Sequence, residues 1–83
     1  MKIDKIEENM GVRMFYGAAE EAIRVGDSLL ILRDKQEVGE CTVVGVTVGG
    51  KLLDRAQVGE TAGCLLRGTA SSLVEVGDHL RLT

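Results

Sequence analysis

Hydrophobic side chains along this chain gather in several short stretches whose pattern favours β-strands. Aliphatic and β-branched residues dominate positions 28–32, 41–48 and 61–67, and residues 79–83 alternate between polar and apolar side chains. Both patterns are typical of strands. Because glycine turns separate the stretches at intervals of roughly 8–12 residues, the pattern predicts a small all-β fold, either a barrel or a sandwich.

A Val-Gly-acid triplet stands directly before three of the predicted strands. The triplets are Val25-Gly26-Asp27, Val58-Gly59-Glu60 and Val76-Gly77-Asp78. Glycine adopts positive φ angles without steric cost, and an acidic side chain accepts hydrogen bonds from the backbone of a turn. We therefore expect each triplet to form the turn through which the chain enters a strand.

Two segments have the spacing or the propensity of a helix instead. Ile3, Ile6 and Met10 recur at intervals of three and four residues. Residues 18–23, with the sequence AAEEAI, combine strong helix formers. On these local grounds we predict a short helix near residues 18–23, whereas the rest of the pattern favours strands.

The 83 residues fit a single domain spanning residues 1–83. A hydrophobic fraction of 45% and a charged fraction of 28% argue against intrinsic disorder. A domain this small has a small core, so we expect function on a face, a groove or an interface rather than in a deep pocket. The charged residues 1–9 do not resemble a secretory signal, and the uncharged run 41–50 is too short to span a bilayer, so the expected location is the cytoplasm.

Residues 45–51, with the sequence GVTVGGK, match the first seven positions of a phosphate-binding loop. The next residue is Leu52, where such loops need Ser or Thr to hold Mg²⁺. The Val-Thr-Val inside the match is also strand-like. A glycine bend at the end of a long strand is therefore the favoured interpretation, and nucleotide binding is the minor alternative.

Cys41, Cys64 and His79 nominally offer metal ligands, but none has the close pair spacing of zinc sites. We expect two reduced thiols that pack as small hydrophobes, and we expect His79 to face solvent if Leu80 faces the core. The serines at 71–72 lie in a short connection without the flanking signature of a nucleophile. The prediction is therefore a protein that is not an enzyme and that needs no cofactor and no metal.

The charge and aromatic content weigh against a protein held mainly by nucleic acid. The net charge is -3, and aromatic residues make up 2% of the chain, too few for stacking exposed bases. Lys51, Arg55 and Arg67 form a possible cationic edge for an RNA backbone. Leu52 and Leu53 lie in a turn that exposes leucines easily, which favours docking of a protein partner. These five residues are the candidate binding surface.

A family resemblance rests on four groups of residues in the second half of the chain. They are Lys51-Leu52-Leu53-Asp54, Val58-Gly59-Glu60, Gly63 and Leu65-Leu66-Arg67-Gly68. This segment resembles domain 2 of elongation factor Tu and related translational GTPases, which reads close to K-L-L-D-x-x-x-A-G-E-x-x-G-x-L-L-R-G. The match runs without a gap over residues 41–68, the turns at 23–27 and 75–78 also fit, and residues 1–22 match poorly. The resemblance implies an all-β fold, a small closed six-stranded antiparallel β-barrel.

The chain departs from the family at positions that serve tRNA. Before the K-L-L-D lysine, family members carry Glu, Phe and Arg, and the acid and the aromatic help to hold the aminoacyl end of tRNA. The matching positions here are Thr47, Gly49 and Gly50, and Thr61 replaces the family asparagine. The chain also contains no GTPase domain, so it binds no GTP in the manner of those factors.

The family resemblance nevertheless suggests a class of function. In these factors domain 2 packs against the GTPase domain and contacts ribosomal RNA, and the resemblance places Arg67, Gly68 and residues 11–15 at such surfaces. The expected function is a stand-alone, non-enzymatic module that binds a protein partner or a second copy of itself. The alternative is a translation-related module that contacts RNA or the ribosome. Neither reading involves a membrane.

Overall fold

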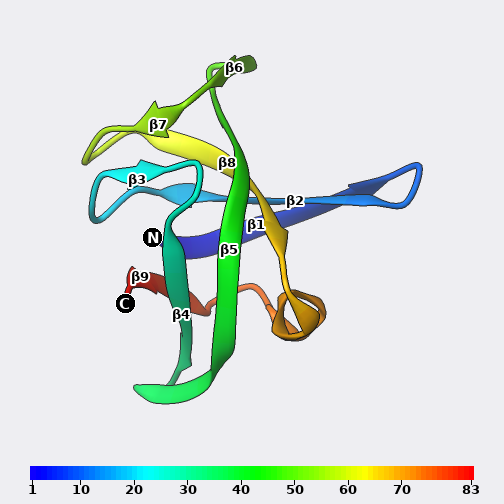
Figure 1. Cartoon of the computed structure of the whole chain (residues 1–83), viewed down its shortest axis with the longest axis vertical. Helices are drawn as coiled ribbons and strands as arrows, with labels where there is room; N and C mark the ends of the chain where they lie inside the picture. Colours follow the sequence, from blue (N-terminus) through cyan, green and yellow to red (C-terminus); the bar gives the residue numbers. More distant parts are fainter.

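The chain folds into antiparallel strands and one short 3-10 helix (Figure 1). The computed structural model covers all residues from Met1 to Thr83. The elements are β1 (Lys2–Asn9), β2 (Val12–Ala18), β3 (Ile23–Arg24), β4 (Ser28–Arg33), β5 (Gln36–Val48), β6 (Lys51–Leu53), β7 (Arg55–Ala56), β8 (Thr61–Arg67), η1 (Thr69–Leu73) and β9 (His79–Leu82). The four strands predicted from the hydrophobic pattern are present as β4, β5, β8 and β9, although β5 starts earlier, at Gln36.

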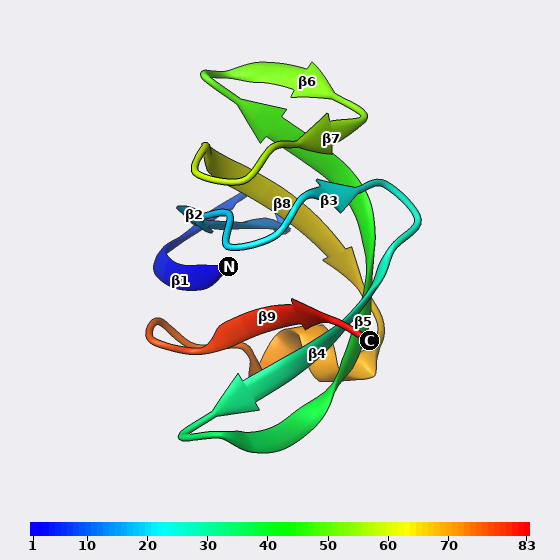
Figure 2. The same ribbon diagram turned by 90° about the vertical axis from the view of Figure 1, so that its left-hand side faces the viewer.

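Six strands are hydrogen-bonded in a ring. Their order is β4-β9-β1-β2-β8-β5, and the pairing of β4 with β5 brings the ring back to its start. β6 adds to β5 outside the ring, and β3 pairs with β7 as a separate ribbon. Figure 2 shows β3, β6 and β7 at one end of the molecule and β4, β9 and η1 at the other. The six strands do not lie evenly round one axis, so the arrangement is a near-closed ring of antiparallel strands.

The three Val-Gly-acid triplets form the predicted turns. Gly26, Gly59 and Gly77 have φ angles of 97°, 89° and 98°, which glycine adopts more readily than other residues. In each turn the acidic side chain accepts a hydrogen bond from the backbone N–H three residues earlier, over 2.7–2.8 Å. Each turn leads directly into β4, β8 or β9, as the sequence predicts.

The helical spacing of the first apolar residues arises from a strand with a bulge. Ile3 pairs with Gly17 and Lys5 with Tyr16, so one extra residue is inserted between them. A bulge of this kind returns the chain to the same face of the sheet after three residues instead of two. Ile3 is therefore buried and Ile6 also packs against the core, although β1 is a strand.

The helix predicted near residues 18–23 is wrong. β2 continues to Ala18, residues 19–22 form an irregular crossing, and β3 begins at Ile23. Long-range bonds take the place of helical ones: the N–H of Ala19 donates to the carbonyl of Glu60, and Gly59 donates to the carbonyl of Ala19. Tertiary pairing and the burial of Ala19 therefore override the local helix propensity.

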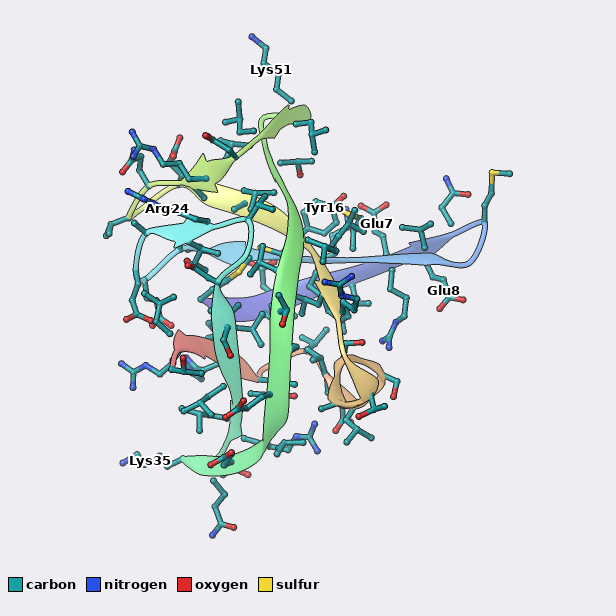
Figure 3. All side chains as sticks on the ribbon, in the orientation of Figure 1. Glu7, Glu8, Tyr16, Arg24, Lys35 and Lys51 are labelled. Atoms are coloured by element: carbon teal, nitrogen blue, oxygen red, sulfur yellow. The ribbon has the colours of Figure 1, made fainter.

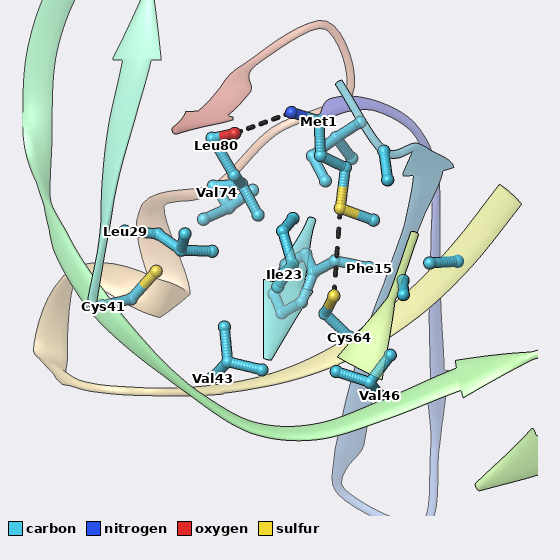
Figure 4. Packing of buried hydrophobic residues seen from close by; sticks show 14 of the residues in the cluster. Met1, Phe15, Ile23, Leu29, Cys41, Val43, Val46, Cys64, Val74 and Leu80 are labelled. Atoms are coloured by element: carbon cyan, nitrogen blue, oxygen red, sulfur yellow. Dashed lines mark hydrogen bonds between the residues drawn. The ribbon is translucent and has the colours of Figure 1, made fainter. Parts of the chain in front are cut away.

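The core fills the inside of the ring with small and medium side chains around one aromatic ring (Figure 4). Phe15 and Met1 are its largest members, and the thiol of Cys64 donates to the sulfur of Met1 over 3.8 Å. The core residues are Met1, Ile3, Phe15, Ala19, Ile23, Leu29, Ile31, Cys41, Val43, Val46, Ala56, Ala62, Cys64, Val74 and Leu80. The structure contains no helix with the length and apolar character that crossing a bilayer needs.

Candidate binding surface

Four of the five predicted surface residues come together at the end of the molecule formed by β6 and β7. Gly49 and Gly50, with φ angles of 60° and 78°, turn the chain from β5 into β6. The exposed fraction is 75% for Leu52 and 42% for Leu53, and Lys51 extends into solvent beside them (Figure 3). Because successive side chains of a strand point to opposite faces, Leu52 and Leu53 are exposed on the two faces of β6, where a binding partner can contact them.

The β3–β7 ribbon adds two residues to this end. Arg24 lies directly opposite Arg55 in the ladder, and both side chains are exposed. The N–H of Val25 donates to the carbonyl of Asp54, which places Val25 beside the end of β6. We call the combined set the β6–β7 surface. It consists of Arg24, Val25, Lys51, Leu52, Leu53 and Arg55.

None of the three cations of the β6–β7 surface forms an ion pair. Arg24, Lys51 and Arg55 have no carboxylate oxygen within 4.0 Å. Like charges directly opposite each other destabilise a strand pair, so the Arg24–Arg55 position is unfavourable for the isolated fold. An anionic group on a binding partner would relieve this repulsion.

Arg67 lies elsewhere. It pairs with Thr42 of β5, whereas Lys51 pairs with Val48 of the same strand. Six positions along a strand correspond to about 20 Å. The predicted cationic edge of Lys51, Arg55 and Arg67 is therefore divided between two parts of the molecule, and Arg24 occupies the place beside Arg55.

A second surface feature is an apolar groove between β2 and β8. The two strands pair only from Phe15 and Cys64 onward, and they separate beyond that point. Val44, which a bulge in β5 pushes outward, and η1 complete the walls. The residues that line the groove are Gly11, Val12, Arg13, Phe15, Val44, Leu65, Leu66, Ser71 and Ser72.

The structure gives His79 a partner that sequence reasoning missed. Its Nδ1 lies 3.1 Å from Oε1 of Glu20, and the same oxygen lies 3.0 Å from the α-ammonium group of Met1. Hydrogen bonds from these two groups lower the pKa of Glu20. Leu80 is buried, as the alternation predicts, whereas His79, expected to face solvent, is half-buried against Glu20. Glu20 thereby joins the start of β1 to β9. Ser71 and Ser72 line the groove instead, and their hydroxyls donate to the carbonyls of Gly68 and Thr69.

Both cysteines are buried, free thiols in the core. Burial raises the pKa of Cys41 and of Cys64 to about 11. Thiols in this state are poor nucleophiles and poor metal ligands, because both roles need the thiolate. No group of three or more His, Cys, Asp or Glu side chains is arranged so that it could hold a metal ion.

The phosphate-loop match has the geometry of a hairpin. Residues 45–48 belong to β5, Gly49 and Gly50 form the turn, and Lys51 begins β6. A phosphate-binding loop leads into a helix whose N-terminus faces the phosphates, whereas a strand follows here. The interpretation as a glycine bend at the end of a long strand is confirmed.

Long-range pairing explains what sequence reasoning missed at this end of the molecule. Arg24 and Val25 belong to a turn motif in the sequence, and nothing local shows that they lie beside Asp54 and Arg55. Comparison of the sequence with known protein families finds none whose model matches this chain.

Proposed function

We propose that this chain is a non-enzymatic interaction module of the cytoplasm, a closed six-stranded β-barrel of the type found as domain 2 of elongation factor Tu, and that it binds a protein partner through the β6–β7 surface. The observation that carries the proposal is the pair Leu52 and Leu53, exposed to 75% and 42% on a tight hairpin. Single exposed leucines are common, but three exposed aliphatic residues on neighbouring segments, Val25, Leu52 and Leu53, favour an interface.

The arrangement of strands and turns supports the likeness to domain 2. The six ring strands are antiparallel and the triplet turns stand where the resemblance puts them, at residues 23–27, 58–60 and 75–78. The segment Lys51-Leu52-Leu53-Asp54 that carries the resemblance forms β6 and the turn into β7. Because one frame serves many functions, the proposed role rests on the surface and not on the likeness alone.

The composition of the β6–β7 surface suits a partner with an apolar patch bordered by acidic groups. It contains the exposed aliphatic residues Val25, Leu52 and Leu53. Its cations Arg24, Lys51 and Arg55 lack carboxylate partners within the chain. Interfaces of this kind combine an apolar centre with a charged rim, and the rim contributes more to partner choice than to affinity.

One observation favours contact with RNA as the second candidate. Arg24 and Arg55 face each other across the β3–β7 ribbon without a neutralising group, an arrangement that a phosphate oxygen would stabilise. The few cations at this end would give only a modest dependence of affinity on salt. The module would then contact ribosomal RNA or tRNA through backbone phosphates rather than bases.

A binding experiment with two variants tests the proposal. Immobilised wild-type chain, Leu52→Asp and Val76→Asp are each exposed to a cell lysate, and bound proteins are identified by mass spectrometry. Val76 is the matched control, because it is 60% exposed but lies in the turn before β9. We expect a partner that wild type and Val76→Asp retain and Leu52→Asp loses. Equal capture by all three, or no capture, contradicts docking through Leu52.

The RNA alternative needs a separate measurement. Fluorescence anisotropy with labelled ribosomal RNA, at about 50 and about 200 mM salt, reports phosphate contacts. RNA contact through the ribbon predicts binding that weakens in salt and with Arg55→Ala but not with Leu52→Asp. Absence of binding at the lower salt concentration excludes this candidate.

A further inference from the structure

The part of β8 that borders the groove between β2 and β8 has an open edge. β8 runs to Arg67, but its last partner on β2 is Cys64, which pairs with Phe15. Figure 1 shows why the pairing stops: the β1–β2 hairpin extends away from the ring, while β8 bends toward η1. No backbone hydrogen bond outside the strand ladders involves residues 65–67. The edge of β8 that faces β2 is therefore uncovered over these residues.

The alternation of the ladder shows that Leu66 supplies the free backbone groups of this edge. In the β5–β6 hairpin, Val48 and Lys51 flank the two-residue glycine turn and direct their backbone groups toward each other. Thr47 therefore directs its groups the other way, to its β8 partner Gly63. Because the direction alternates along a strand, Leu66 directs its N–H and carbonyl away from β5 and into the groove. Open groups of this kind are templates for pairing with another strand.

Apolar side chains surround this edge. The groove has a volume of about 350 Å³, and its apolar walls are formed by Val12, Phe15, Val44, Leu65 and Leu66. Val12 and Val44 are 49% and 41% exposed in the single chain. An extended peptide directs alternate side chains to the same face. A peptide of this kind can therefore cover the exposed side chains of the groove while its backbone pairs with Leu66.

Arg13 crosses the groove and is held there by weak polar contacts. Its Nη1 donates to the carbonyl of Ser72 over 3.4 Å, and its Nε lies 3.8 Å from Oε2 of Glu8. The guanidinium carbon lies 5.2 Å from the centre of the Phe15 ring. Hydrogen bonds from arginine to a carboxylate are about 2.7–2.9 Å long and roughly twice as strong as neutral ones. A carboxylate on an occupant therefore competes well with the Ser72 carbonyl, and the guanidinium opens the groove when it turns toward that carboxylate.

A second cation lies at the end of the same edge. Arg67 follows Leu66 as the last residue of β8, and no carboxylate oxygen lies within 4.0 Å of its side chain. Complementary charge selects partners and excludes those with the wrong sign. The groove is therefore suited to an extended occupant with aliphatic side chains and acidic groups.

We propose that the groove between β2 and β8 binds an extended segment of a partner protein, which adds a strand to the open edge of β8 at Leu66. Alternate aliphatic side chains of the segment lie against Val44 and Leu65, and an acidic side chain replaces the Ser72 carbonyl as the partner of Arg13. The site shares no residue with the β6–β7 surface, so it is a contact in addition to the docking proposed above.

Peptide selection tests the chemistry of the occupant. A phage-displayed library of random peptides is selected on the immobilised wild-type chain. We expect enriched peptides to carry aliphatic or β-branched residues at alternate positions, together with Asp or Glu. Failure to enrich any peptide, or enrichment of basic peptides, overturns the proposal.

Binding of an enriched peptide, measured by fluorescence anisotropy, locates the site. Val44→Asp and Arg13→Glu should each raise the dissociation constant at least about tenfold, with circular dichroism showing that both variants fold. Leu52→Asp is the matched control, because Leu52 is 75% exposed on the β6–β7 surface, and this variant should bind as wild type does. Equal binding by all variants, or weaker binding by Leu52→Asp alone, contradicts the proposed site.

Peptides methylated on backbone nitrogens test the strand pairing without any change in the protein. Methylation of alternate nitrogens removes the donors from one edge of an extended peptide. We expect one alternate set to lower the affinity at least about tenfold and the other set to change it little, because only one edge of the peptide faces β8. Equal effects of the two sets rule out strand addition.

Sedimentation equilibrium of the chain alone separates a partner segment from a second copy. We expect a monomer. A dimer that Val44→Asp dissociates would make a second copy the occupant and would overturn the proposal. Because the two surfaces use different residues, failure here leaves the proposed docking function intact.

Discussion

Replacement of Asp78 by alanine removes the most heavily bonded acidic side chain of the fold. Asp78 is 2% exposed. Its Oδ1 accepts from Nε of Arg33 over 2.8 Å, and its Oδ2 accepts from Nη2 of Arg33 and from the N–H of Glu75, each over 2.8 Å. The variant leaves these donors without their buried acceptor. The turn before β9 then loses its hydrogen bonds to Arg33 at the end of β4.

The expected loss follows from these contacts. Removing one partner of a buried charge pair costs about 3–5 kcal/mol, because the other partner is left uncompensated. Arg33 is 39% exposed and retains the carboxylate of Glu75 and the carbonyl of Leu73, so the loss belongs near the lower limit. We expect Asp78→Ala to lower the free energy of unfolding by about 3 kcal/mol, which corresponds to a fall in Tm of about 12–24 °C for a domain of this size.

Asp27→Ala is a matched control within the same motif. Asp27 also ends a Val-Gly-acid triplet and accepts a turn N–H, from Arg24 over 2.8 Å, but it has no arginine partner. Loss of one such hydrogen bond costs about 1 kcal/mol. Urea and thermal unfolding followed by circular dichroism measure both variants. Equal losses for Asp27→Ala and Asp78→Ala would refute the argument, since the Arg33 contacts would then contribute nothing.

The same contacts make the stability of the wild type depend on acid. Hydrogen bonds from Arg33 hold the pKa of Asp78 below its usual value. Folding therefore lowers this pKa, so the contribution is complete above the unfolded pKa of about 3.9 and is lost as pH falls through the folded value. Between about pH 5 and about pH 2, wild type should lose more stability than Asp78→Ala. Parallel pH profiles for the two proteins would contradict this reasoning.

Two further predictions concern the core. A Cβ at Gly17 would lie 1.9 Å from the carbonyl oxygen of Lys2, whereas a Cβ at Gly63 would meet only side-chain atoms, the nearest at 2.7 Å. Gly17→Ala should therefore cost about 3 kcal/mol in urea unfolding and Gly63→Ala clearly less, because side chains can turn aside and backbone cannot; equal losses would contradict this. The raised pKa of about 11 for Cys41 and Cys64 predicts that a thiol reagent at about pH 8 labels the folded chain at least about 100-fold more slowly than the urea-unfolded chain. Comparable rates would show that the thiols are accessible.

Sequence reasoning succeeded where the signal was local. The Val-Gly-acid triplets specify turns because glycine and a short acidic side chain act within four residues, and all three turns have the same hydrogen bonds. The density of aliphatic residues likewise sufficed for β4, β5 and β8, and the alternation of polar and apolar residues sufficed for β9. These features do not depend on which strand lies next to which.

Sequence reasoning failed where a bulge or a distant partner decides the structure. The bulge between Ile3 and Lys5 gives a strand the apolar spacing of a helix, and the residues of the predicted helix near Ala19 bond instead to the turn at Glu60. The division of the candidate surface has the same origin. Arg24 joins Arg55 through a long-range ladder, while Arg67 is separated from Lys51 by the length of β5 that lies between their partners.

Two of the Val-Gly-acid turns lie at opposite ends of the molecule and differ in the contacts that hold them. The turn at residues 24–27 places Arg24 and Val25 on the β6–β7 surface and is held by backbone hydrogen bonds and by the Asp27 carboxylate, which has no arginine partner. The turn at residues 75–78 lies at the other end and is fixed to β4 through Arg33. The buried carboxylate of Asp78 and its arginine partner therefore lie away from the residues proposed for binding. A substitution at Leu52 changes an exposed side chain and leaves every core contact in place, so lost binding in that variant reports on the surface rather than on the fold.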